Sequence, residues 1–160
     1  MAKATVYIET TIAGHLTSRL PKDPLVTGQM LATRDWWSSA RQQFDCYTSQ
    51  AVLDEAGSGD PQAAAERLQA LAGLPILRST PAADALAELL LLRAALPLKA
   101  RIDAVHVAVA ATMGMSFLLT WNCKHLANAA MRAKIEKVCR DSGCEPPVIC
   151  TPLELPEVQP

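Results

Sequence analysis

The sequence predicts an α/β domain in which helices cover both sides of a mainly parallel sheet. Short apolar runs alternate with amphipathic helical segments, and the connections between them are short, which is typical of doubly wound domains. Of the 160 residues, 50% are hydrophobic and 19% are charged, as in an ordinary globular protein. The simplest organisation is therefore one domain over residues 1–150, followed by a Pro-rich tail at residues 151–160.

Composition and motif content exclude several classes of function. A formal net charge of −1 gives no global field that would attract nucleic acid, so such binding would have to come from local patches. The sequence has neither the G-x-G-x-x-G fingerprint of dinucleotide binding nor a P-loop. Its five cysteines include no C-x-x-C pair, which disfavours a zinc site. Without an apolar leader or a run long enough to span a bilayer, we expect a cytoplasmic protein with no membrane contact.

The first half of the chain is predicted to contain three strands and the helices between them. A β-rich run at residues 4–8 ends at Glu9 and two threonines, of which Thr11 is an N-cap candidate for a short helix toward Leu20. The elements that follow are a helix from Asp23-Pro24 through Arg41, a strand at 44–48, a helix at 50–56 capped by Ser49, a helix from Asp60-Pro61 and a strand at 75–77.

The second half is organised around residues 102–126. Val105, Val109 and Met113 recur at helical spacing, and the run Phe117-Leu118-Leu119 is typical of a buried parallel strand. The other expected elements are a helix from Thr80-Pro81 to near Pro97, a helix at 124–139, a strand at 147–150 and a loose tail over the residues LELPEVQP.

Three acids and one amide fall near the carboxyl ends of predicted strands or in the helices of the same units. They are Glu9, Glu55, Asp103 and Asn122. In open parallel sheets that edge is where ligands bind. Three converging carboxylates repel one another, and a divalent cation relieves the repulsion. Oxygen ligands suit Mg²⁺ or Mn²⁺, and such a site can activate water for in-line attack on a phosphodiester.

The blocks VYIETTI, SQAVLDEAGSGDP, IDAVHVAVAATMG and FLLTWNCKHLAN resemble, in this order, the successive motifs of PIN domains, in particular the VapC-like branch. The resemblance implies a three-layer α/β/α sandwich and a Mg²⁺- or Mn²⁺-dependent ribonuclease that hydrolyses RNA. It also implies frequent homodimerisation and a cognate antitoxin protein for VapC-like members.

The resemblance assigns the family's metal and catalytic positions to residues of this chain. The first acid falls on Glu9, the second on Glu55 and the third on Asp103, while the fourth metal-site position falls on Asn122 and the site hydroxyl on Thr11. Two positions depart from the commonest pattern. Glu9 replaces the usual Asp, so its extra methylene moves the carboxylate outward or makes it fold back, and Asn122 supplies no negative charge where Asp is frequent.

Each of these residues also has a purely structural interpretation. Glu9 can cap the following helix, and Asp103 can be an ordinary first-turn helix acid. Glu55 can be a solvated charge, Asn122 a turn residue and Thr11 an N-cap hydroxyl.

Five further residues are given interpretations outside the candidate site. His106 is expected to be a core histidine that hydrogen-bonds a neighbour. Lys124 and His125 are expected to be solvated. Of the adjacent Trp36 and Trp37, one should pack in the core, because neighbouring helical residues face different directions.

Three functions fit the sequence. The first is a metal-dependent endoribonuclease that is the toxin of a toxin–antitoxin pair. The second is a PIN-like module that binds RNA or a partner protein without cutting. The third is a small-molecule phosphatase or another α/β hydrolase, for which the sequence offers no nucleophile elbow.

Overall fold

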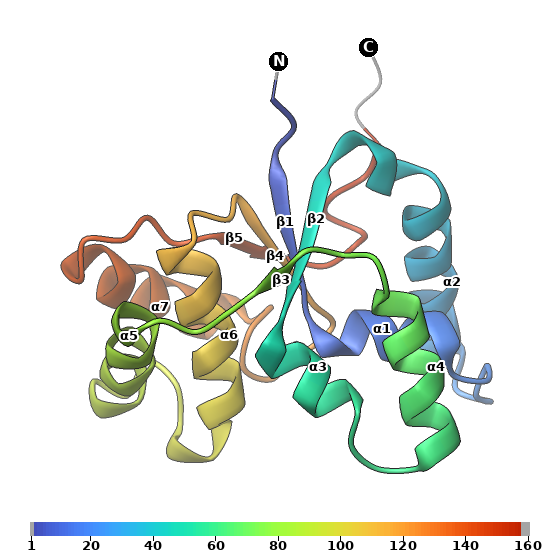
Figure 1. The fold of residues 1–160 in the computed structure, drawn as a ribbon, viewed down its shortest axis with the longest axis horizontal. Helices are drawn as coiled ribbons and strands as arrows, with labels where there is room; N and C mark the ends of the chain where they lie inside the picture. Colours follow the sequence, from blue (N-terminus) through green and yellow to red (C-terminus); the bar gives the residue numbers. More distant parts are fainter. Residues whose placement is uncertain (1, 158–160) are drawn as a thin grey trace.

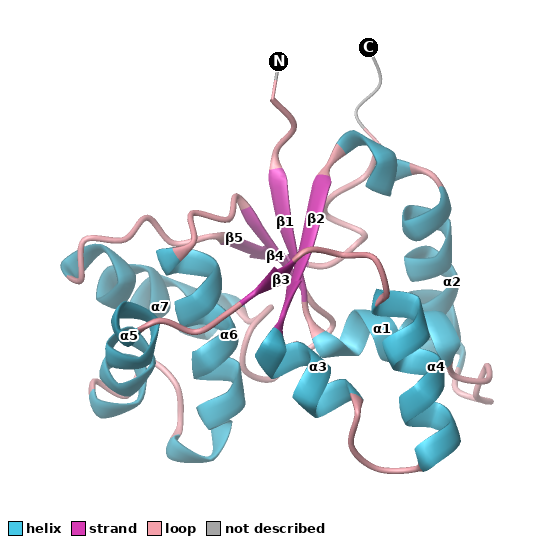
Figure 2. Cartoon of the chain, viewed as in Figure 1, coloured by secondary structure: helices cyan, strands magenta, loops and turns pink. Residues whose placement is uncertain are grey.

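The computed structural model describes residues 2–157, and over this range it confirms the α/β/α sandwich. Five strands form one sheet in the order β3-β2-β1-β4-β5, and every neighbouring pair is parallel. Helices α5, α6 and α7 lie on one side of the sheet, whereas α1, α2 and α4 lie on the other (Figures 1 and 2). The strands are β1 (Thr5–Ile8), β2 (Asp45–Ser49), β3 (Ile76–Leu77), β4 (Phe117–Leu119) and β5 (Val148–Cys150).

Several helices begin where the sequence places a capping residue. Asp23, Asp60 and Thr80 each accept a backbone N–H bond at the start of a helix whose first residue is proline, and Ser49 caps α3 in the same way. The helices are α1 (Thr10–Thr17), α2 (Pro24–Ser38), α3 (Gln50–Ala56), α4 (Pro61–Leu71), α5 (Pro81–Leu92), α6 (Arg101–Thr112) and α7 (Ala129–Asp141), with 3₁₀ turns at Ala40–Gln43 and Leu98–Ala100.

The core is built around β1, which lies in the middle of the sheet between β2 and β4. Val6, Tyr7 and Ile8 are all fully buried, because helices cover both faces of the strand. Alanines on α6, such as Ala104 and Ala108, are also fully buried and let this helix approach its neighbours closely. Since all five strands run in one direction, their carboxyl ends meet at a single edge.

Three helices differ in extent from the prediction. Helix α2, which was expected to run through Arg41, ends at Ser38 and is followed by the 3₁₀ turn at Ala40–Gln43. Helix α5 ends at Leu92, not near Pro97, because Ala94 adopts a left-handed conformation (φ 54°) and the N–H groups of Ala95 and Leu96 bond back to the carbonyl of Leu90. Helix α7 begins at Ala129 instead of Lys124, since residues 123–127 form turns and the side chain of Asn128 accepts the N–H of Ala130.

The tail was expected to be loose, and this is wrong for the part that the structure describes. Leu155 is buried, and its carbonyl accepts a 2.7 Å hydrogen bond from Nε1 of Trp36. Trp36 is thus the tryptophan that packs in the core, as predicted for one of the pair, while the half-buried Trp37 stacks against Arg41. Residues 158–160 of the predicted tail lie outside the described range.

No helix within residues 2–157 is long and apolar enough to cross a membrane.

Candidate functional site

Glu9 is the last residue before α1, and its side chain folds back onto that helix. Its Oε2 accepts the backbone N–H of Thr11 at 2.7 Å, so Glu9 is the N-cap of α1. Its Oε1 accepts the hydroxyls of Thr11 at 2.8 Å and Thr120 at 2.6 Å. The helix-capping role of Glu9 is therefore confirmed. The expectation that Thr11 is the N-cap is wrong, because the longer side chain of Glu9 reaches the free N–H groups of the first turn.

The environment of Glu9 is unfavourable for an isolated charge. The residue is only 3% exposed, and burial raises the pKa of its carboxyl group. The nearby His106 and the hydrogen bonds from Thr120 and Thr11 act in the opposite direction. A buried carboxylate of this kind is stabilised by a nearby cation.

Glu55 lies in the last turn of α3 and points toward the same place. Its Oε1 accepts the hydroxyl of Thr10 and lies 3.2 Å from Nε2 of His106. The side chain is 39% exposed, so Glu55 lies at the surface, where its carboxylate has two side-chain partners. Hydrogen bonding to His106 is the largest of the effects that hold the pKa of Glu55 below its ordinary value, and the bond from Thr10 adds to it.

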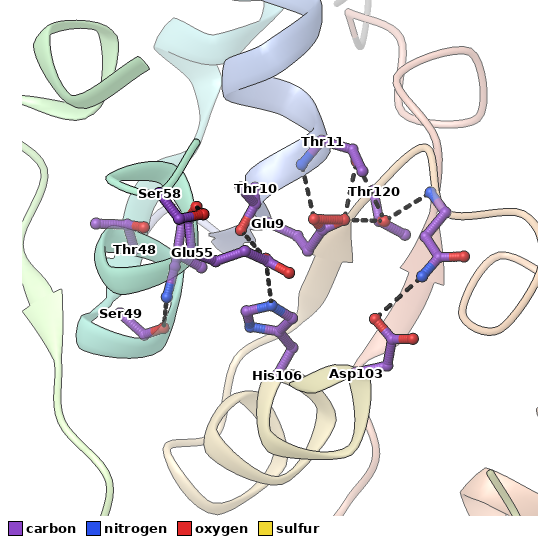
Figure 3. A network of polar contacts seen from close by, with 12 residues as sticks. Glu9, Thr10, Thr11, Thr48, Ser49, Glu55, Ser58, Asp103, His106 and Thr120 are labelled. Atoms are coloured by element: carbon purple, nitrogen blue, oxygen red, sulfur yellow. Dashed lines mark hydrogen bonds and ion pairs between the residues drawn. The ribbon is translucent and has the colours of Figure 1, made fainter. Parts of the chain in front are cut away.

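His106 connects the core to this cluster. It is completely buried and hydrogen-bonds a neighbour, as predicted: its Nδ1 lies 2.7 Å from the hydroxyl of Tyr7, which lies 2.7 Å from Oγ of Ser49. Its Nε2, however, faces Glu55 in the candidate site (Figure 3). One ligand atom each of Glu9, Glu55 and His106 lie within 4.8 Å of one another. We define these three residues as the Glu-Glu-His cluster.

Asp103 and Asn122 form a second group beside this cluster. Nδ2 of Asn122 donates to Oδ1 of Asp103 at 3.0 Å, and Nδ1 of His125 lies 3.0 Å from Oδ2 of Asp103. The side chain of His125 is only 15% exposed, so the expectation that it is solvated is wrong. Asn122 also shapes the chain locally, because its carbonyl accepts the N–H groups of Leu126 and Ala127. Its interpretation as a turn residue is therefore confirmed.

Thr120 joins the two groups, although no sequence pattern marked it as a site residue. Its hydroxyl donates to Glu9 and accepts the backbone N–H of Asn122 at 2.9 Å. The hydroxyl of Thr11 is used in the same way, donating to Glu9 and accepting the N–H of Trp121 at 2.8 Å. The loop after β4 is thereby tied to the acid that follows β1.

The donor set of the site fits a divalent cation. Two carboxylates and an imidazole lie close together, one carboxylate is buried, and protein and metal charges would nearly balance. Of the residues predicted from the sequence, Glu9 and Glu55 lie in the Glu-Glu-His cluster, while Asp103 and Asn122 lie in the adjacent group and Thr11 holds Glu9 in place. His106 and His125 were missed as site residues. For His106 the available signal was its position three residues after Asp103, on the same face of a helix.

Comparison with solved structures identifies the fold. A chain from the crystal structure of VapBC2 from Rickettsia felis, bound to a DNA fragment from their promoter, superposes with a TM-score of 0.60; the match covers 92% of this chain and 98% of that chain at 14% identity. VapC20 of Mycobacterium tuberculosis, a Sarcin-Ricin loop cleaving toxin, gives a TM-score of 0.57 over 75% of this chain and 92% of that chain at 16% identity. No protein-family model and no curated protein sequence matches the chain.

The layers and the all-parallel sheet define a three-layer α/β/α fold. More narrowly, the domain has a VapC-like PIN fold, as the sequence motifs predicted.

Proposed function

We propose that the protein is a metal-dependent endoribonuclease that hydrolyses RNA phosphodiester bonds and acts as the toxin of a toxin–antitoxin pair. The observation that carries this proposal is the buried carboxylate of Glu9, which lies with Glu55 and His106 at the carboxyl edge of the sheet, beside Asp103. The likeness of the fold to a Sarcin-Ricin loop cleaving toxin supports the assignment to RNA.

In this proposal each residue of the site has a separate role. Glu9 and Glu55 hold Mg²⁺ or Mn²⁺, which when bound makes water more acidic and offsets negative charge on the phosphate. Asp103 and Asn122 complete the site at its second group, where His125 fixes the orientation of Asp103. Thr11 positions Glu9, because its backbone N–H and its hydroxyl both donate to that carboxylate.

The proposal extends to partners and location. RNA is the substrate, a second copy of the chain forms a homodimer, and an antitoxin protein blocks the site. These expectations derive from the VapC-like fold, and a cytoplasmic location is consistent with such a role.

The decisive experiment combines calorimetric titration of Mn²⁺ with cleavage of a fluorogenic RNA. In wild type we expect metal binding and cleavage, and in Asp103→Asn a loss of cleavage of about a hundredfold or more. Asp54→Asn is the matched control, because Asp54 is an exposed acid next to Glu55 whose side chain contacts Gln50. Unchanged cleavage in Asp103→Asn, or no metal binding by wild type, would refute the proposal.

One observation favours the alternative of a module that binds without cutting. Both polar atoms of the Asn122 side chain already have protein partners, since Nδ2 donates to Asp103 and Oδ1 accepts the backbone N–H of His125. The variant Asn122→Asp separates the two functions. A large gain of cleavage over an inactive wild type would favour the binding module, whereas an active wild type would favour the nuclease.

A further inference from the structure

His106 is the residue of the site whose role neither the sequence motifs nor the fold comparisons explain. Its ring is completely buried, yet one of its nitrogens faces an acid at the opening of the site and not the core. We propose that His106 is a metal ligand through Nε2, together with Glu9 and Glu55, and that this nitrogen makes the site prefer Mn²⁺ or a similar transition-metal ion to Mg²⁺. This inference rests on the proposed function, because it concerns the same site.

The geometry of the cluster supports direct coordination. Two ligand atoms that lie about 2.1 Å from an ion and at right angles are about 3 Å apart. Nε2 of His106 and Oε1 of Glu55 are 3.2 Å apart, and the ligand atoms of all three residues lie within 4.8 Å. Ligand atoms on opposite sides of an ion are about 4.2 Å apart, so ligand atoms within 4.8 Å of one another need to approach by about 0.6 Å to share one ion. Glu55 has room for this movement, because its side chain is 39% exposed whereas Glu9 and His106 are buried.

The alternative ligand, Asp103, is held away from this cluster. Its two carboxylate oxygens are engaged separately by Asn122 and His125, both at 3.0 Å. Its oxygens are also not among the ligand atoms that cluster within 4.8 Å in the described residues. His106 lies one helical turn further along α6 and takes the position nearest the two glutamates.

The neighbours of His106 allow Nε2 to become a ligand. Coordination through Nε2 requires that the proton of the neutral ring sits on Nδ1 and has an acceptor. The hydroxyl of Tyr7, 2.7 Å from Nδ1, can accept that proton and donate its own to Ser49, because hydroxyl groups rotate to suit their partners. Tyr7 thus accepts the hydrogen bond that a histidine ligand donates to a carbonyl or a carboxylate in other metal sites.

The chemistry of the donor set decides the metal preference. Mg²⁺ favours oxygen ligands and retains water, whereas imidazole is a good ligand for first-row transition metals. Two carboxylates and one neutral imidazole carry a charge of −2, which a dication neutralises. A site with this composition is expected to bind Mn²⁺ more tightly than Mg²⁺.

The test is electron spin echo spectroscopy of the Mn²⁺-loaded full-length protein, which detects nitrogen bound to the metal. We expect a ¹⁴N signal in wild type that changes to a ¹⁵N signal when only histidine is labelled with ¹⁵N. Because the chain contains three histidines, His15→Asn is the matched control, and His125→Asn, which also releases Asp103, tests the remaining histidine. The Mn²⁺ that either variant binds should retain the nitrogen signal. In His106→Asn the signal should vanish, Mn²⁺ affinity should fall about tenfold or more, and the preference for Mn²⁺ over Mg²⁺ should shrink.

The labelling and the variants of the other two histidines locate the ligand even if variants of His106 fail to fold. Bound Mn²⁺ without a nitrogen signal, or a signal lost in His125→Asn, would overturn the inference while leaving the proposed nuclease intact. Failure of the wild type to bind Mn²⁺ or Mg²⁺ would instead refute the proposed function itself.

Discussion

Thr120→Val tests whether the carboxylate of Glu9 is a charged group that depends on its threonine partners. The substitution keeps the shape of a fully buried side chain but removes the hydroxyl that donates to Glu9 at 2.6 Å and accepts the N–H of Asn122 at 2.9 Å. A hydrogen bond to a charged group contributes about 1.5–3 kcal/mol. Asn122 is only partly buried, so its backbone N–H can bond to water. We therefore expect the metal-free variant to lose about 2–3 kcal/mol of unfolding free energy at pH 8.

The loss should depend on pH in a defined direction. Burial raises the pKa of Glu9 above its ordinary value of 4.5, so its contribution to stability is greatest below that value and decreases as the pH rises through the folded-state pKa. The hydroxyl of Thr120 lowers this pKa, and its removal widens the interval between the unfolded and folded values. A neutral carboxyl group requires less from its partner than a carboxylate, so the loss should be smaller at pH 5 than at pH 8.

Urea denaturation at pH 5 and pH 8, with EDTA present, measures both values. Thr112→Val is the control, because the hydroxyl of Thr112 donates to the Ala108 carbonyl at 2.8 Å within α6 and contacts no site residue in the described structure. The control should lose less than about 1 kcal/mol at either pH. An equal loss for Thr120→Val at both pH values, or a loss at pH 8 below about 0.5 kcal/mol, would refute the argument.

Three further predictions concern other contacts. Tyr7→Phe removes the hydroxyl next to Nδ1 of His106, and calorimetry should show an affinity for Mn²⁺ that is weaker by roughly tenfold to hundredfold. Unaltered affinity would contradict the role of Tyr7 as the acceptor of the Nδ1 proton. Trp36→Phe removes the 2.7 Å hydrogen bond to the Leu155 carbonyl, so urea denaturation should show a loss of about 1 kcal/mol of unfolding free energy. Carboxypeptidase should also digest the tail faster in this variant, and equal digestion rates would contradict a docked tail. Asn128→Ala removes the N-cap of α7 and should lower the unfolding free energy by about 1 kcal/mol, and a neutral result would show that the cap contributes nothing.

The sequence predicted the fold well because local signals and the global pattern agree. The Asp-Pro and Thr-Pro pairs mark helix starts that the structure confirms, and the run Phe117-Leu118-Leu119 is the buried strand β4. The predicted element boundaries are wrong where tertiary contacts determine where a helix ends. The end of α5 depends on a left-handed residue, Ala94, which composition does not reveal, because glycine is the usual residue at such positions.

The site was predictable in position but not in its contacts. Parallel strands bring their carboxyl ends to one edge, so topology places Glu9, which follows β1, and Asn122, which follows β4, at that edge. Glu55 and Asp103 belong to helices α3 and α6. The separation into two groups does not follow from topology. It depends on which side chains hydrogen-bond each acid. The partners of Asp103 include His125, which was expected to be solvated, and those of Glu55 include His106, which was expected to be a core histidine.

The presence of Glu instead of Asp at position 9 has a physical explanation in the fold. The sequence left open whether the extra methylene moves the carboxylate outward or makes it fold back, and it folds back to reach both Thr11 and Thr120. A carboxylate has about four lone-pair sites, and three donors leave one of them, on Oε2, for a cation. Glu9 can therefore act only as a monodentate ligand.

Asp is the commoner residue at this position in the family, but its side chain is one methylene shorter. At position 9 it could not keep all three of these hydrogen bonds and still face His106. We therefore expect Glu9→Asp to weaken Mn²⁺ binding and to lower the unfolding free energy, both measurable on the same purified sample. A tighter metal site in this variant would mean that Glu9 is a defect of the site, and not a residue whose length is matched to its two threonine partners.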